Sequence, residues 1–139
     1  TPFLEYPNKW TIVLSLTSND GSKSFQNLAL EKGNFLFQEV LDSSSKWGTT
    51  SNMMYVVGAT KAKDLLEIRK IIPEHFLLIP GIGAQGGDLH EVIKNGINND
   101  VGLLINSSRG IIYAGNDRNF DSKSREEALK IKNKMSNYL

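Results

Sequence analysis

The residues with the clearest potential for chemistry are four glycines and one arginine that follow two apolar runs. Glycines stand at positions 81, 83, 86 and 87 of the stretch FLLIPGIGAQGGDLHEVI. Arg109 stands in INSSRG, directly after the next apolar run. Glycine lets backbone N–H groups approach an anion closely, and a guanidinium offers a planar fork that matches two phosphate oxygens. Together these residues predict a phosphate-binding site.

Two kinds of phosphate site fit this pattern. Gly81, Gly83 and Gly86 have the spacing of the dinucleotide fingerprint, which also needs an acidic residue about 20 positions further on. The next run ends INSSRG without a carboxylate, although Arg109 could hold the 2′-phosphate of NADP. The alternative is a (β/α)8 barrel, in which the loops after the last two strands commonly bind phosphate. The non-functional interpretation is a plain tight turn and a surface ion pair of Arg109. We favour the barrel, because it accounts for both segments.

Four apolar runs are predicted to be the strands that position these loops. They are nearly continuous in hydrophobicity, which is typical of parallel strands buried on both faces. The expected strands are residues 11–16, 53–59, 76–80 and 101–106. Helices are expected over residues 24–42 with an interruption at Gly33, and over 61–72, 88–96 and 124–139.

Several residues are predicted to start or stop these helices. Thr60 is the expected N-cap of the second helix, and Pro73 its stop. Gly96 is expected to end the third helix in the left-handed conformation. A capping box from Ser124 to Glu127 is expected to open the last helix.

The repeated β-α order predicts an α/β fold with a parallel sheet and right-handed crossovers. With 139 residues, the chain is expected to be one domain. Two architectures fit the order of elements, a small doubly wound sheet and half of an eight-stranded barrel. Composition alone does not choose between them.

Composition excludes several function classes. A net charge of +1 gives no electrostatic argument for nucleic acid or a membrane as a partner. The sequence has no cysteine, which excludes disulfides and thiolate zinc sites and is compatible with the cytoplasm. No apolar run approaches the length of a membrane-spanning helix.

Four segments, in order, resemble the orotidine 5′-phosphate decarboxylase family, specifically its longer bacterial subgroup. They are LSLTSNDGS, VVGAT, LLIPGIGAQGGD and INSSRGIIYA, and the resemblance runs over residues 1–139. It implies a TIM barrel of which this chain is the C-terminal half, strands five to eight. It also implies a homodimeric lyase of UMP biosynthesis that converts orotidine 5′-phosphate to UMP and CO2 without a metal or organic cofactor.

The resemblance assigns roles to particular residues. It implies that Arg109, supported by Gly110, binds the substrate phosphate. The residues that match the family's phosphate loop are Gly83, Gln85 and Gly86. Ser18 matches a serine that hydrogen-bonds the pyrimidine, flanked by Thr17 and Asn19, and Pro80 matches a proline that shapes the substrate-side turn.

The family's catalytic array of aspartates and lysines is not found in this sequence. Its signature is an Asp, a Lys two residues on, and an Asp three residues beyond. In ATKAKDL, Lys61 and Asp64 have the right spacing, but Ala59 stands where the first Asp belongs. We therefore expect no catalytic residue in this chain, an array upstream of Thr1, and an inactive isolated chain. The alternatives are a phosphate-binding half-barrel without turnover and a related sugar-phosphate decarboxylase.

Overall fold

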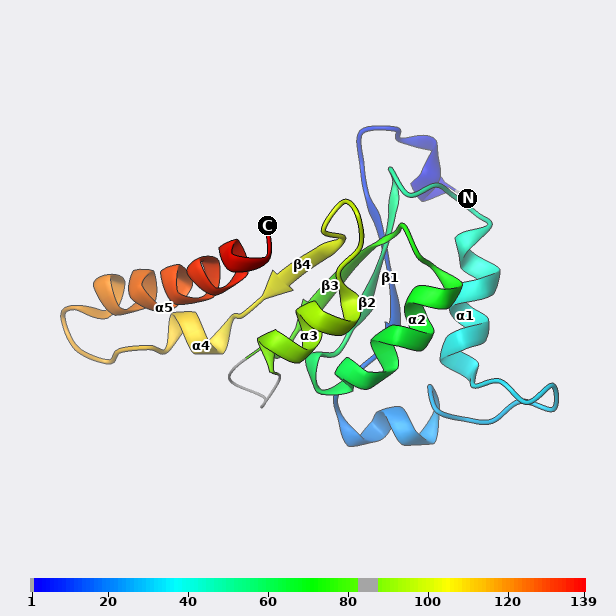
Figure 1. The fold of residues 1–139 in the computed structure, drawn as a ribbon, viewed down its shortest axis with the longest axis horizontal. Coiled ribbons are helices and arrows are strands. Elements are labelled where there is room, and N and C mark those ends of the chain that lie inside the picture. Colours follow the sequence, from blue (N-terminus) through cyan, green and yellow to red (C-terminus); the bar gives the residue numbers. More distant parts are fainter. Residues whose placement is uncertain (1, 83–87) are drawn as a thin grey trace.

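The computed structural model describes residues 2–82 and 88–139. Within them, four strands form one parallel sheet in the order of the sequence (Figure 1). The strands are β1 (Thr11–Leu16), β2 (Met53–Val57), β3 (Phe76–Pro80) and β4 (Leu103–Asn106). Each strand pairs in parallel with the next one along the chain.

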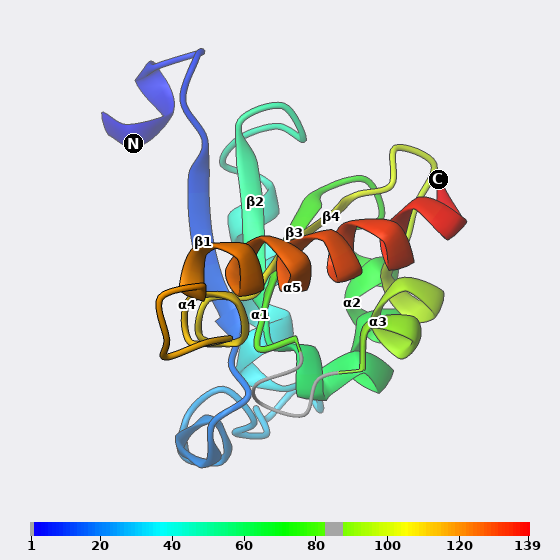
Figure 2. The same cartoon turned by 90° about the vertical axis from the view of Figure 1, so that its left-hand side faces the viewer.

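Helices follow each strand. The α-helices are α1 (Leu36–Ser45), α2 (Leu65–Ile71), α3 (Leu89–Gly96), α4 (Arg109–Ile112) and α5 (Phe120–Met135). Short 3-10 helices are η1 (Pro2–Glu5), η2 (Asp20–Ser24), η3 (Ala59–Asp64) and η4 (Ser136–Tyr138). Figures 1 and 2 show α1, α2 and α3 together on one face of the sheet, while α5 lies beyond β4. None of these helices is long and apolar enough to cross a membrane, in the ranges that the structure describes.

The hydrophobic core lies between the sheet and helices α1 to α3. The register places Val13, Tyr55, Leu77 and Leu103 in one row across the sheet, and this row faces the helices. Successive side chains of a strand point to opposite faces, so the alternate row faces away from the helices. Within the described residues that alternate row is only partly covered, which agrees with a half-barrel whose interior-facing side chains find no partner in this chain.

The architecture confirms an α/β fold built from four consecutive βα units. A doubly wound sheet reverses its strand order at a switch point and carries helices on both faces. Here the order β1-β2-β3-β4 has no reversal, and α1, α2 and α3 share one face. These features favour the half-barrel of the two expected architectures.

Three helix boundaries differ from the prediction. The second helix starts with the 3-10 helix η3, whose N-cap is Gly58 rather than Thr60. The last helix begins at Phe120, so Ser124 lies inside it and does not open it. The first helix begins only at Leu36, after a turn in which Gly33 adopts a positive φ of 86°, and residues 25–35, part of the expected helix, form none.

Gly96 was expected to adopt the left-handed conformation, and this expectation is wrong. It is the last residue of α3, and the extended Ile97 is the C-cap. A side chain at position 96 would meet Leu65 Cδ1 at 3.1 Å and Leu103 Cδ2 at 3.2 Å. Glycine therefore allows α3 to end close against α2 and β4.

Candidate functional site

The structure brings Pro80 and Arg109 to one pocket at the carboxyl ends of neighbouring strands. Pro80 ends β3 and lies in register with Asn106, which ends β4. The pocket has a volume of about 200 Å³. Its lining residues are Pro80, Gly81, Ile82, Asn106, Ser107, Ser108 and Arg109.

Local backbone geometry forms this pocket. Gly81 has a φ of 90°, which turns the chain away immediately after β3. The Ser107 hydroxyl donates to the carbonyl of Ile82 at 3.4 Å and so links the two loops. Arg109 is the first residue of α4, is exposed, and takes part in none of the ion pairs among the described residues. The surface ion pair considered for Arg109 is thus absent from that part of the chain.

Ser18 follows the carboxyl end of β1, so it lies at the same end of the sheet as this pocket. Its hydroxyl oxygen is buried and has no hydrogen-bond partner among the described residues. Within the same residues, the hydroxyl oxygens of Ser15 and Ser22 are buried without a partner as well, so this feature by itself does not mark a ligand site.

Gly58 makes room for Ser18. A Cβ atom at position 58 would lie 2.1 Å from Ser18 Oγ and 2.7 Å from Ser18 N. The Gly58 amide also donates to the Leu16 carbonyl at 2.8 Å, which joins the ends of β1 and β2. The glycine of the VVGAT segment, which has no side chain, therefore leaves the space that Ser18 occupies.

Gln26 contacts Thr17, one of the predicted site residues, and sequence reasoning did not single it out. Its side-chain oxygen accepts from the Thr17 backbone at 2.7 Å and from the Thr17 hydroxyl at 3.0 Å. The Asn19 side-chain oxygen lies 2.5 Å from the same hydroxyl, which has one proton to donate to either acceptor. Gln26 lies in a segment that was expected to be helical, and its contact with Thr17 depends on how that segment folds back toward the end of β1.

The two parts of the site lie at the carboxyl ends of the strands, but they do not lie on neighbouring strands. Ser18 follows β1 and Arg109 follows β4, with β2 and β3 between them. Three inter-strand spacings of ~4.8 Å separate these strands by ~14 Å in a flat sheet, and less in a curved one. Gly83, Gln85 and Gly86, the predicted phosphate loop, lie outside the described residues. Gly110 is the second residue of α4, next to Arg109.

Lys61 and Asp64 lie in η3, after β2, where Lys61 departs from helical geometry with a φ of −104° and a ψ of 31°. This placement agrees with the rejection of ATKAKDL as a catalytic array. Asp20, after β1, is exposed and pairs with Lys23 at 3.0 Å, and the hydrogen bond from Lys23 lowers its pKa. Exposure and a pair with a nearby lysine are both typical of a surface charge, here that of Asp20.

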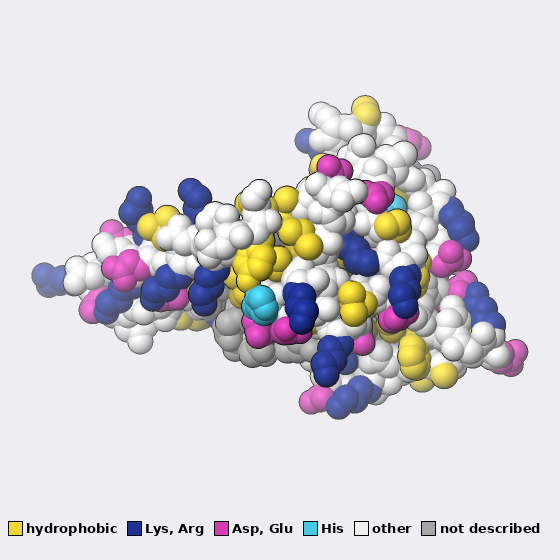
Figure 3. Space-filling model, viewed as in Figure 1, with side chains coloured by type: hydrophobic (Ala, Val, Ile, Leu, Met, Phe, Trp, Pro, Cys, Tyr) yellow, Lys and Arg dark blue, Asp and Glu magenta, His cyan; other side chains and the backbone are white. Residues whose placement is uncertain are grey.

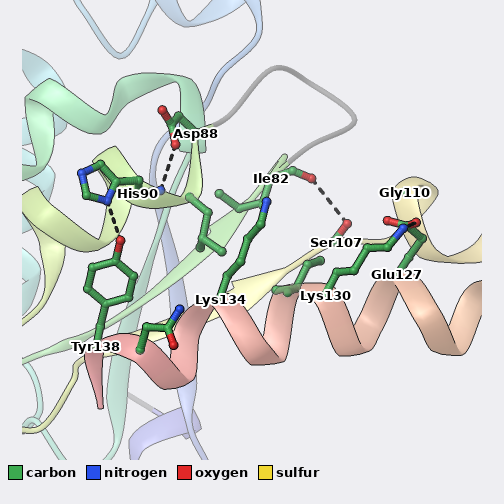
Figure 4. Close-up of a pocket in the computed structure, with 12 residues that line it drawn as sticks. Ile82, Asp88, His90, Ser107, Gly110, Glu127, Lys130, Lys134 and Tyr138 are labelled. Carbon is green, nitrogen blue, oxygen red and sulfur yellow. Dashed lines mark hydrogen bonds and ion pairs between the residues drawn. The ribbon is translucent and has the colours of Figure 1, made fainter.

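A larger pocket of about 530 Å³ separates α3 from α5 (Figure 4). His90 Nδ1 lies 2.5 Å from the Tyr138 hydroxyl, and this contact ties the end of the chain to α3. Asp88 accepts from the His90 backbone at 2.9 Å and caps α3. Lys130 is paired with Glu127 of its own helix. These contacts account for the side chains of Asp88, His90, Lys130 and Tyr138 as helix caps and pairs, whereas Lys134 and Asn137 also line the pocket.

Comparisons with known proteins place the chain beside one group of enzymes. No protein-family model matches the chain. It is 54% identical over 135 residues to the orotidine 5′-phosphate decarboxylase of Flavobacterium johnsoniae, covering 97% of this chain and 49% of that protein. It is 51% identical over 139 residues to the protein of that name from Bacteroides fragilis, covering 100% of this chain and 51% of that one.

A solved structure shows the same relation. The structure of Leishmania donovani OMP decarboxylase matches with a TM-score of 0.76 and 32% identity, over 94% of this chain and 50% of that chain. The four parallel βα units thus match half of a barrel structure. The chain spans about half the length of the curated relatives it matches.

Proposed function

The chain is homologous to orotidine 5′-phosphate decarboxylases over its whole length, and from this we propose that it forms the C-terminal half of such an enzyme. In this proposal it binds the phosphate and the pyrimidine of orotidine 5′-phosphate, which the complete enzyme converts to UMP and CO2. The observation that carries the proposal is the common pocket of Pro80 and Arg109 at the ends of β3 and β4.

Arg109 is the proposed phosphate ligand. Arg109 lines the pocket, and two N–H groups of a guanidinium can bond two phosphate oxygens. The Gly110 backbone and the loop of Gly83, Gln85 and Gly86 are proposed to complete the phosphate site. Ser18 is proposed to hydrogen-bond the pyrimidine, with Thr17, Asn19 and Pro80 shaping its surroundings.

Phosphate binding contributes to the reaction from a distance. The phosphate does not react, so its binding energy can position the ring whose carboxylate leaves. The departing CO2 leaves a carbanion that must be stabilised and protonated, and in the family an aspartate and lysine array does this. We propose that the array lies in polypeptide outside this chain, which also completes the barrel. The isolated chain would then have no turnover. We also propose, from the resemblance alone, that the complete enzyme is a homodimer located in the cytoplasm.

Nucleotide binding tests the two assigned roles. The chain would be produced together with the part of the Flavobacterium johnsoniae relative that lies outside the matched region, and binding of UMP and uridine measured by calorimetry. Arg109→Ala should weaken UMP roughly 10- to 100-fold, the loss of a charged hydrogen bond, and leave uridine unchanged. Ser18→Ala should weaken both ligands.

The matched control is Arg118→Ala, an exposed arginine outside the pocket, which should change neither affinity. An Arg109→Ala variant that binds UMP like the unmodified protein would refute the phosphate role. A related sugar-phosphate decarboxylase is the second candidate, favoured by the phosphate pocket alone. It predicts equal binding of UMP and ribose 5-phosphate, and no effect of Ser18→Ala.

A further inference from the structure

The segment after β1 contains three hydrogen-bonded side chains that surround the proposed pyrimidine ligand Ser18. The Gln26 side-chain oxygen accepts from the Thr17 backbone N–H at 2.7 Å and lies 3.0 Å from the Thr17 hydroxyl. The same hydroxyl lies 2.5 Å from the Asn19 side-chain oxygen. Gln26 is thereby connected to Thr17 directly and to Asn19 through Thr17, and these are the two neighbours of Ser18 in the chain.

The short distance between Thr17 and Asn19 determines how the Asn19 amide is turned. A separation of 2.5 Å lies in the range of O–H···O hydrogen bonds and is shorter than N–H···O hydrogen bonds. Two oxygen atoms this close need a proton between them, so the Thr17 hydroxyl donates to the Asn19 oxygen. The NH2 group of the Asn19 amide therefore points away from Thr17, and it can act only as a donor.

Gly21 leaves room for this NH2 group. A Cβ atom at position 21 would lie 3.0 Å from Asn19 Nδ2, which is tighter than an ordinary contact. The Ser22 backbone N–H donates to the Asn19 carbonyl at 3.0 Å and closes the turn. Asn19 is exposed, so a ligand can reach its amide. Neighbours in the chain thus hold both the backbone and the side chain of Asn19.

Gln26 is itself connected to the hydrophobic core. Its backbone carbonyl accepts from the Phe37 N–H at 2.9 Å. Phe37 lies in the first turn of α1 and is buried. The Gln26 side chain therefore extends from a fixed backbone, and the contacts with Thr17 and Asn19 begin at a rigid part of the fold.

Hydrogen bonds, and not charge, must recognise a pyrimidine at this end of the molecule. Figure 3 shows positive and negative side chains side by side at its lower end, where η2 lies in Figure 1. Asp20 and Lys23 of η2 form one such pair. The uracil ring of UMP is uncharged and presents carbonyl oxygens, which need donors. An amide that turned its oxygen toward them would repel them.

We propose that Gln26 is a positioning residue for pyrimidine recognition. Through Thr17 it holds the Asn19 amide so that the NH2 group donates to a ring carbonyl of the pyrimidine, beside the contact of Ser18. Gln26 itself need not touch the ligand. This inference rests on the proposed function, which supplies the nucleotide. It adds Gln26, to which the resemblance assigns no role, and it makes Asn19 a donor to the ring.

Nucleotide affinity in a double-mutant cycle tests the proposal. The chain would be produced with the remaining part of the Flavobacterium johnsoniae relative, and binding of UMP and ribose 5-phosphate measured by calorimetry. Gln26→Leu removes the acceptor and should weaken UMP about 3- to 10-fold, the loss of one neutral hydrogen bond, with ribose 5-phosphate unchanged. In an Asn19→Ala background the same change should have little effect, because Gln26 acts through Asn19. Gln26→Glu keeps an acceptor oxygen for Thr17 and should restore most of the lost affinity.

The matched control is Gln38→Leu. The Gln38 side-chain oxygen accepts from the Phe35 backbone N–H at 2.8 Å, which is the same kind of bond at the start of α1. Its loss should change neither affinity.

Three results would overturn the inference. They are an unchanged UMP affinity in Gln26→Leu, an equal effect of this change with and without Asn19, and an equal loss of UMP and ribose 5-phosphate. An unmodified protein that binds UMP no better than ribose 5-phosphate would contradict the proposed function, and the inference with it.

Discussion

At the scale of single residues, Ser18 fits its position because Gly58, which lies against it, has no side chain. Gly58 leaves the space that the Ser18 hydroxyl and backbone occupy. Gln26 holds the preceding Thr17 by its backbone N–H at 2.7 Å. Two residues that need not touch the substrate, Gly58 and Gln26, therefore determine the position of Ser18, which is proposed to bind the pyrimidine.

Replacing Gly58 should disturb both stability and site. In Gly58→Ala the new methyl group would overlap Ser18 Oγ and N, so the turn after β1 must shift. We expect a loss of about 1–3 kcal/mol in the free energy of unfolding, measured with urea. In the control, Gly115→Ala, the nearest atom is the flexible Lys123 Cδ, and the loss should be much smaller. Equal losses in both variants would contradict the steric explanation.

His75 should make stability depend on pH. It is buried against Tyr55, with ring centroids 5.4 Å apart, and burial, then the charge of Arg69, lower its pKa below 6.5. Below pH 6.5 the unfolded chain therefore binds a proton that the folded chain resists. The free energy of unfolding should fall as the pH decreases below about 6.5, and stay free of this effect above it.

Urea unfolding at pH 7.5, 6.5 and 5.5 measures this dependence. His75→Phe keeps an aromatic ring against Tyr55 and should flatten the decrease between pH 6.5 and 5.5. His90→Phe is the control, because His90 is exposed, and it should leave the decrease in place. An unchanged slope in His75→Phe would exclude His75 as its source.

At the scale of elements, Arg69 of α2 joins the ends of several helices and strands. Its guanidinium donates to the carbonyls of His75 at 2.6 Å, Gly96 at 2.7 Å and Gly102 at 2.9 Å. Two longer bonds reach Ile72 and Pro73. Burial lowers its pKa to about 10, so it stays charged at neutral pH. One side chain thus connects α2, the end of α3, and the starts of β3 and β4.

Removing this connection should be among the most destabilising single changes. Arg69→Met keeps the aliphatic length but removes a donor from the part-buried carbonyls of His75 and Gly96, while the Gly102 carbonyl still accepts from the Leu77 N–H at 2.8 Å. We expect a loss of at least about 3 kcal/mol, since each unsatisfied buried group costs about 1–3 kcal/mol. Arg125→Met, at an exposed position of α5, should change the unfolding midpoint very little. A similar midpoint in both variants would show that the Arg69 bonds contribute nothing.

The strands were easier to predict from the sequence than the helix ends. Residues 11–16 and 76–80 are strands with the predicted bounds, because apolar β-rich runs ended by polar residues or turns carry a local signal. Gly96 and Ser124 have the residue types of caps, yet packing against Leu65 and Leu103 requires the glycine, and α5 begins a turn before Ser124. Residue type alone does not distinguish a cap from a packing requirement.

At the scale of the whole molecule, the approach of Pro80 and Arg109 followed from the order of elements, because consecutive parallel strands end at one edge. The role of Gln26 did not follow, since it depends on how the segment after β1 turns back. Continuous hydrophobicity in the strands suggested two covered faces, whereas the chain covers only one. The uncovered row of Leu14 and Leu104 has the composition of a barrel interior.

Turnover tests the central proposal most directly. Loss of orotidine 5′-phosphate would be followed by absorbance for the chain alone, and for the chain combined with the remaining half of the Flavobacterium johnsoniae relative. We predict no turnover from the chain alone, turnover from the combination, and a combination with Arg109→Ala in which kcat/KM falls at least about 10-fold. Turnover by the chain alone, or an inactive combination that is nevertheless folded and associated, would contradict the assignment of this chain as the substrate-binding half of a decarboxylase.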